Sequence, residues 1–353
     1  MSDYLRKRFL SHRPDDQFRA RANPGRTYSY KSWPIGQFAR KPLTARGSQC
    51  DLVACRPSRA SIHIGAHRLG EPIAMPAIVV RFVRFARCLL VLLGVLALFS
   101  ARGAMASEQV VSVPLAEGTS ISYLLTQQDG SAPRWVLVMF PGSAGDLELS
   151  QQPDGTIRMR EKNNFLIRAR QLFVDAQFAT AIVDAPSDQP GGYSDAFRAS
   201  PRSAQDLAQV AASLRNRFPQ AKLVLVGTSR GTISTAYVGR ALPDVWDAVV
   251  HTSTLGSPAR GQATPLIGFD YGAIRPRQLF VQHADDGCFL CSYEALRRIA
   301  ESSQYALITV HGGDVRGKPC EALSHHGFYG RDEAVVAAIK AWISGQPWQD
   351  DVG

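Results

Sequence analysis

A serine held between two glycines is the first group in this sequence that could carry out chemistry. The motif Gly227-Thr228-Ser229-Arg230-Gly231 directly follows an apolar run at 222–226 and precedes a helical pattern at 230–242. A sharp turn from a strand into a helix exposes the serine hydroxyl above the sheet, and the free N–H groups of the helix N-terminus point to the same place. The two glycines allow the close backbone passage that such a turn requires. The spacing therefore predicts that Ser229 is a nucleophile.

The elements that would position this serine alternate between strand and helix patterns along residues 107–345. Short apolar runs are typical of strands buried in a parallel sheet, and apolar residues at every third or fourth position are typical of helices packed on it. The expected helices follow a cap at Asn163 or Asn164, a Ser203-x-x-Asp206 capping box, the nucleophile motif, and a cap at Asp332. We predict one α/β domain over 107–353, with a mostly parallel central sheet and helices on both faces. The expected strands, of which the first two lie at an edge, are 109–114, 120–125, 135–140, 178–183, 222–226, 246–251, 278–283 and 305–310.

The serine motif and its flanking strand and helix resemble the α/β-hydrolase superfamily, and the resemblance extends over residues 120–345. In that superfamily the nucleophile is followed along the chain by an Asp or Glu and then by a His, and this sequence offers candidates in that order. The resemblance implies a serine hydrolase that acts through an acyl-enzyme. It implies no cofactor.

Two adjacent histidines, His325 and His326, lie just before the final helical pattern, where the superfamily carries its catalytic histidine. An imidazole at that place would accept the proton of the serine and later protonate the leaving group. The His326-Gly327-Phe328 sequence resembles the usual setting of that residue, so we expect His326 in the role, with His325 as the alternative. A pair of histidines can also bind a metal, but no third ligand stands at a convincing spacing, and we expect no metal.

Two carboxylates, Asp285 and Asp286, follow the strand predicted at 278–283. One carboxylate is needed to accept the N–H of the histidine and to stabilise the imidazolium. The Asp286-Gly287-Cys288 sequence places Asp286 at the turn of the loop, so we favour it, and Asp285 stays a nearly equal alternative. Asp314, in a later glycine-rich loop, is a remote third candidate.

Two backbone N–H groups are expected to face the oxyanion of the tetrahedral intermediate. One is that of Arg230, the residue after the nucleophile. The other is expected from Pro141-Gly142-Ser143-Ala144-Gly145, which follows the strand predicted at 135–140 and resembles the glycine-rich loop of the superfamily. By that match we assign the second donor to Ser143, with Gly142 as the alternative. The side chain of Arg230 either contacts an acidic substrate group or pairs with a neighbouring carboxylate.

Three cysteines follow residue 106, namely Cys288, Cys291 and Cys320. In an oxidising compartment two of them are expected to pair. A Cys288–Cys320 bridge would tether the acid loop to the histidine loop, and a Cys291–Cys320 bridge would do so almost as well. The C-x-x-C spacing of Cys288 and Cys291 lacks the strand and helix context of a thioredoxin motif.

The net charge of +10 belongs to the first third of the chain. Residues 1–106 hold 18 of the 40 Lys and Arg and 5 of the 30 Asp and Glu, which leaves 22 basic and 25 acidic residues in 107–353. The main domain is therefore slightly acidic and has no basic stripe, which argues against nucleic-acid binding.

A secretory signal peptide is predicted at 75–106. Arg81, Arg84 and Arg87 precede a 12-residue apolar run at 88–99, and the small-x-small site Ala104-Met105-Ala106 follows. A membrane span needs about 20 apolar residues, so an uncleaved anchor is the less favoured alternative and would be the only membrane contact. Because signal peptides begin a chain, we expect translation to start at Met75 and residues 1–74 to be an upstream reading error or a disordered tail. The location is then periplasmic or secreted.

The sequence as a whole predicts a serine hydrolase that cleaves an ester or amide bond in a small molecule. An esterase is favoured, and a peptidase or amidase of the same fold is the nearest alternative. A binding protein that uses the fold without catalysis is the alternative from another class. The sequence indicates no oligomeric state.

Overall fold

One nine-stranded sheet organises the domain. The computed structural model describes residues 106–257 and 266–353. The strand order is β1-β2-β6-β3-β7-β8-β9-β10-β11. The β1–β2 and β2–β6 pairs are antiparallel, and every other neighbouring pair is parallel. The strands are β1 (Ala106–Pro114), β2 (Ser120–Gln128), β3 (Trp135–Phe140), β6 (Phe178–Val183), β7 (Lys222–Thr228), β8 (Ala248–Thr252), β9 (Arg277–His283), β10 (Ala306–Val310) and β11 (Asp351–Val352), and a separate two-stranded sheet joins β4 (Ser150–Gln151) to β5 (Ile157–Arg158).

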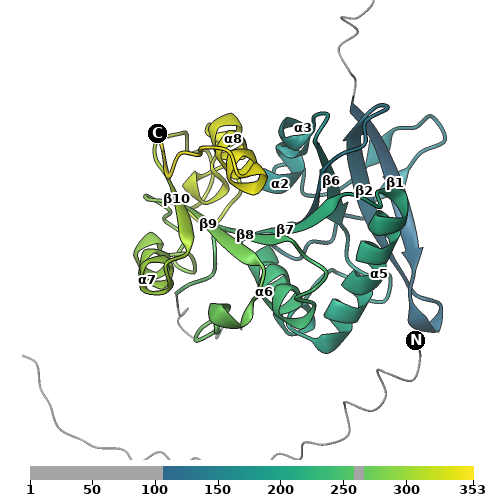
Figure 1. Cartoon of the computed structure of the whole chain (residues 1–353), viewed down its shortest axis with the longest axis horizontal. Coiled ribbons are helices and arrows are strands. Elements are labelled where there is room, and N and C mark those ends of the chain that lie inside the picture. Colours follow the sequence, from purple (N-terminus) through teal and green to yellow (C-terminus); the bar gives the residue numbers. More distant parts are fainter. Residues whose placement is uncertain (1–105, 258–265) are drawn as a thin grey trace, which may run out of the picture. The chain divides into compact units, whose positions relative to one another are not determined.

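Helices cover both faces of the sheet (Figure 1). One face carries α5 (Pro201–Arg217), α6 (Gly231–Ala241) and α7 (Tyr293–Ser303), whose buried residues share one apolar cluster. The other face carries α2 (Phe165–Arg168), α3 (Arg170–Phe173) and α8 (Asp332–Ser344), whose buried residues share a second cluster. A short helix, α4 (Asp195–Arg198), contacts both α5 and α6. No helix among the described residues is long and apolar enough to cross a membrane.

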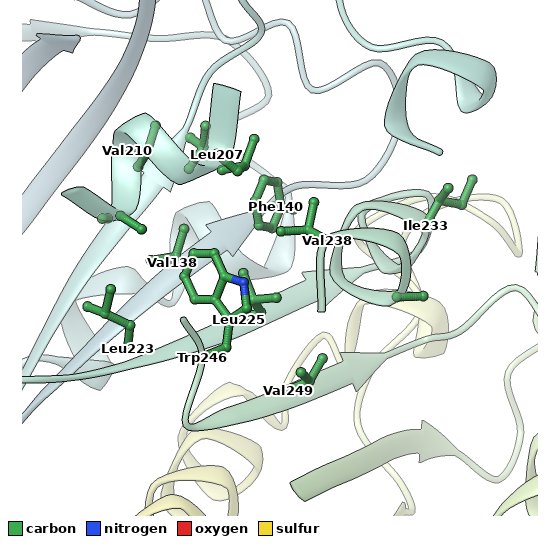
Figure 2. Close-up of a cluster of buried hydrophobic side chains, with 14 of the residues drawn as sticks. Val138, Phe140, Leu207, Val210, Leu223, Leu225, Ile233, Val238, Trp246 and Val249 are labelled. Atoms are coloured by element: carbon green, nitrogen blue, oxygen red, sulfur yellow. The ribbon is translucent and has the colours of Figure 1, made fainter. Parts of the chain in front are cut away.

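The central strands are apolar because both of their faces are covered. Every residue of β3 and β6 is buried, as expected for parallel strands between two helical layers. Figure 2 shows how side chains from three neighbouring strands meet those of α5 and α6. The residues labelled there are Val138, Phe140, Leu207, Val210, Leu223, Leu225, Ile233, Val238, Trp246 and Val249.

Three predicted elements differ from the structure. The second predicted strand is not at the edge, because β2 pairs with β1 on one side and β6 on the other. The helix predicted after Asn164 divides into α2 and α3, and Leu172, expected on its buried face, is 41% exposed. The predicted box Ser203-x-x-Asp206 lies inside α5, because Ser200 caps that helix ahead of Pro201 at the first helical position, a strong start signal.

One further helix start also differs. Asp332 is the first residue of α8, and Arg331 occupies the cap position without a side-chain bond. The helix α7 and the strand β11 were not predicted. The signal segment predicted at 75–106 and the tail at 1–74 lie outside the described residues, apart from Ala106 at the start of β1.

Candidate active site

Ser229 occupies a tight turn between β7 and α6. Its φ of +52° lies in the left-handed region that non-glycine residues seldom adopt. The flanking glycines are required, since a Cβ on Gly227 would meet Gly231 O at 2.5 Å and one on Gly231 would meet Phe140 O at 2.0 Å. The Ser229 N–H donates to Thr252 O at 3.0 Å, which ties the turn to the end of β8. The backbone therefore holds this serine in one strained and well-supported position.

His326 and Asp286 form a buried pair beside the serine. His326 Nδ1 lies 3.0 Å from Asp286 Oδ2, and the two side chains are 5% and 0% exposed. His326 belongs to a short 3₁₀ helix, His325–Gly327, and Asp286 follows the end of β9. A carboxylate that accepts the Nδ1–H leaves Nε2 as the basic nitrogen of the imidazole. His326 and Ser229 line one cavity, so this nitrogen shares a space with the serine hydroxyl.

Asp286 is held by two further hydrogen bonds. Gln282 Nε2 donates to Asp286 Oδ2 at 2.8 Å, and the N–H of Cys288 donates to Oδ1 at 2.9 Å. Gln282 is itself fixed, because its Oε1 accepts the N–H of Thr254 at 3.1 Å. Gln282 was not among the predicted site residues, although a glutamine inside the apolar strand β9 is a signal of a buried polar role.

The rival candidates lie elsewhere. The side chain of Asp285 makes no hydrogen bond or ion pair with His326, and its backbone carbonyl lies 3.2 Å from His325 Nδ1 instead. His325 stacks on His283, with ring centroids 4.1 Å apart and planes 5° apart. Asp314 lies in the loop after β10, where its N–H donates to Tyr329 O at 2.8 Å. Of the predicted acids and histidines, the structure brings Asp286 and His326 together.

Among residues 106–257 and 266–353, two clusters bring three metal-ligating groups within 4.8 Å of one another, and neither is suited to hold a metal. In the first, His283, Asp285 and His325, the two imidazole rings are stacked and nearly parallel. A metal must lie in the plane of each imidazole that binds it, and two stacked planes share no such point. His283 also donates from Nε2 to Gly312 O at 2.7 Å and accepts the Asp285 N–H at Nδ1, while burial lowers its pKa.

The second cluster joins Cys288, Cys291 and His326. Cys288 is bonded to Cys320, with Cα atoms 4.5 Å apart, so its sulfur is not a thiolate ligand. Cys291 is a free and buried thiol whose pKa is raised by burial. Of the two pairings that were expected, the structure contains Cys288–Cys320, and it joins the loop of Asp286 to the loop of His326.

The predicted oxyanion loop lies against the nucleophile. An ideal Cβ on Gly142 would stand 3.0 Å from Ser229 Cβ and 3.5 Å from its Oγ. Ser143 has a φ of +50° and lines the same cavity of about 40 Å³. Arg230 occupies the N-cap position of α6, and its guanidinium pairs with Asp195 at 2.7 Å, which answers the question left open for that side chain. The residues around the cavity are Gly142, Ser143, Asn164, Phe165, Thr228, Ser229, Cys320, Ala322, His326 and Gly327.

Arg198 supports this loop from behind and was missed by sequence reasoning. Its side chain is fully buried and pairs with no carboxylate among the described residues. Nη2 donates to Pro141 O at 3.3 Å and to Ser143 O at 3.4 Å, and Nη1 donates to Ser234 Oγ on α6 at 3.0 Å. The ring of Tyr193 covers the guanidinium at 4.5 Å. Because the C=O and N–H of a trans peptide point in opposite directions, the bond to Pro141 turns the N–H of Gly142 away from Arg198.

The strand order and the turn at Ser229 are those of the α/β-hydrolase fold, so the predicted fold class is confirmed. No protein-family model and no curated protein matches the chain. Among solved structures the chain is similar to a serine hydrolase without a lid from Xanthomonas campestris, at 13% identity and a TM-score of 0.46, covering 69% of this chain and 97% of that one. It is also similar to Est1E from Butyrivibrio proteoclasticus, at 13% identity and 0.44, covering 67% and 98%. A third is dienelactone hydrolase from Anabaena variabilis, at 15% identity and 0.44, covering 68% and 98%.

Proposed function

We propose that this protein is a serine hydrolase that cleaves a carboxylic ester through an acyl-enzyme on Ser229. One observation carries the proposal: a serine in a strained turn shares a cavity with a histidine whose far nitrogen is paired with a buried carboxylate. A binding protein has no need of that combination, whereas nucleophilic catalysis needs each part of it.

The reaction follows from the atoms present. Ser229 Oγ attacks the carbonyl carbon while its proton passes to Nε2 of His326, and Asp286 stabilises the imidazolium. The N–H groups of Arg230 and of Ser143 or Gly142 bind the oxyanion. The imidazolium then gives its proton to the departing alcohol as the carbon–oxygen bond breaks. A water molecule, deprotonated by the same imidazole, releases the acyl group and restores the serine.

The proposed substrate is a small molecule, and no cofactor or nucleic acid takes part. Amides are the nearest rival substrates, because the same machinery serves both bonds and only the leaving group differs. For location we propose the periplasm or the exterior of the cell, with which the Cys288–Cys320 disulfide is compatible.

A fluorophosphonate probe tests the proposal. The protein, made in an oxidising compartment, and its Ser229→Ala variant are treated with the probe and weighed by mass spectrometry. We expect one adduct on the parent and none on the variant. We also expect hydrolysis of 4-nitrophenyl acetate by the parent alone. An unlabelled parent whose fold and disulfide are intact would contradict the proposal and favour the binding-protein alternative.

A further inference from the structure

A second cavity adjoins the one that holds Ser229. Its volume is about 380 Å³, and it shares three wall residues with the smaller cavity, namely Ser143, Asn164 and Ala322. The other wall residues are Glu161, Lys162 and Asn163, from the turn that leads into α2. A substrate bound at the serine therefore has direct access to this space.

The walls of the second cavity are polar. They offer one carboxyl, one ammonium, two amides and one hydroxyl, and the only apolar side chain is that of Ala322. The side chains of Glu161, Lys162 and Asn163 make no hydrogen bond or ion pair with any residue in the described ranges. Lys162 and Asn163 are exposed and therefore solvated, whereas Glu161 is half-buried, so Glu161 is the wall group whose missing partner points to a ligand.

Glu161 is the group that most needs explaining. Its φ of +52° is in the left-handed region, where glycine or asparagine would be less strained. Its side chain is half-buried, and burial raises its pKa although the charge of Arg198 opposes that rise. Its carbonyl accepts the N–H of Asn164 at 2.8 Å, which fixes the turn in this shape. A strained and partly desolvated carboxyl without a partner is typical of a functional position.

We propose that this cavity is a subsite for a hydroxylated part of the substrate, so that the favoured substrates are esters bearing a short polyol or hydroxy-acyl group. This inference rests on the proposed function. Hydroxyls both donate and accept, so they can pair with the carboxyl, the ammonium and the amides together. An alkyl chain in the same place would desolvate these groups and give them no partner, which is unfavourable. A hydroxylated group is therefore selected over an alkyl group of the same size.

Two pairs of esters test this inference, one for each side of the scissile bond. The first compares 2,3-dihydroxypropyl butyrate with propyl butyrate, and the second compares methyl 3,4-dihydroxybutyrate with methyl butyrate. In at least one pair we expect kcat/KM for the hydroxylated ester to exceed that for the alkyl ester about tenfold or more, as a few hydrogen bonds supply. Glu161→Leu and Asn163→Leu should each lower that ratio several-fold. Any general loss of activity cancels within the ratio.

Glu148→Leu is the matched control. Glu148 is also a glutamate with a positive φ, but it does not line the cavity. The Glu148→Leu variant should therefore have the same ratio of kcat/KM values as the parent. Ratios of one or less in both parent pairs, or ratios that Glu161→Leu and Asn163→Leu leave unchanged, would overturn the subsite. Labelling of Ser229 by the fluorophosphonate would then leave the proposed hydrolase standing. A parent that is neither labelled nor active on any ester would overturn both.

Discussion

At the scale of single residues, the structure distinguishes two neighbouring carboxylates that the sequence leaves nearly equal. Asp286 is buried and accepts hydrogen bonds from His326, Gln282 and the N–H of Cys288. Asp285 is exposed and offers His325 only its backbone carbonyl. Two adjacent residues thus differ, since Asp286 is hydrogen-bonded to the histidine and Asp285 is solvated.

Substitution of each carboxylate by its amide tests this difference. We expect Asp286→Asn to lower kcat on 4-nitrophenyl acetate by about 10³–10⁴-fold, because an amide can hold the imidazole in the wrong tautomer. Asp285→Asn should keep kcat within a few-fold of the parent. Circular dichroism and the melting temperature show whether both variants are folded. A larger loss of kcat for Asp285→Asn than for Asp286→Asn would contradict this prediction and would give the role of partner to the histidine to Asp285.

Site residues could be predicted where their signal lies within a few neighbouring positions of the sequence, and not where it depends on distant contacts. Ser229 stands in a five-residue motif whose two glycines are required by close contacts in the turn. The local sequence was therefore sufficient to predict the position of this serine. Arg198 acts through carbonyls more than 50 positions away, and no local pattern marks it. The Glu161–Asn164 turn depends on a backbone conformation that the residue types there do not favour.

At the scale of elements, strands were predicted better than helices. The strands β3 and β6 match the predicted bounds, since burial on both faces gives a nearly continuous apolar run. Helix starts were less certain, because Ser200-Pro201 and Ser203-x-x-Asp206 both look like an N-terminus and only one can act as such. The helix α7 was missed although its signal is clear, because Leu296, Ile299 and Ala300 share one face and Ser292 caps its start.

The disulfide is the link between two loops that belong to different elements. Cys288 and Cys320 are 32 positions apart, and a closure of that length stabilises a fold by about 3–4 kcal/mol. We expect Cys288→Ser to lower the melting temperature by several degrees and to reduce kcat, because the loops of Asp286 and His326 lose their tether. Cys320→Ser should act to the same extent. Enzyme assays and thermal melts of both variants provide the measurement.

Cys291→Ala serves as the control for this experiment, since Cys291 is buried but unbonded. Its melting temperature should fall less, and dithiothreitol should inactivate Cys291→Ala as it does the parent. If reduction changes neither activity nor melting in the parent, the tether has no role in positioning the site.

At the scale of the whole molecule, charge and hydropathy divide the chain near residue 106. The basic residues are concentrated before that point, and the described α/β domain follows it. The sequence predicts an export signal that ends at this boundary, because such a signal is read from a short linear segment and not from a packed structure.

Processing at this boundary is directly measurable. We expect the protein recovered from its own cells to begin at Ser107, because Ala104-Met105-Ala106 presents small residues at the cleavage site. N-terminal sequencing of the periplasmic or external fraction checks this. Peptides from 1–74 in the intact cellular protein would contradict a translation start at Met75.

The buried guanidinium behind the loop at 141–145 has a consequence for the pH–rate profile of the proposed enzyme. Burial lowers the pKa of Arg198 to about 10, which is still well above neutral pH. Arg198 therefore stays a cation throughout the neutral range, and its bonds to the carbonyls of Pro141 and Ser143 persist there. The loop thus keeps these two contacts across the neutral range. A change of rate near neutrality would then have a cause other than a rearrangement of this loop.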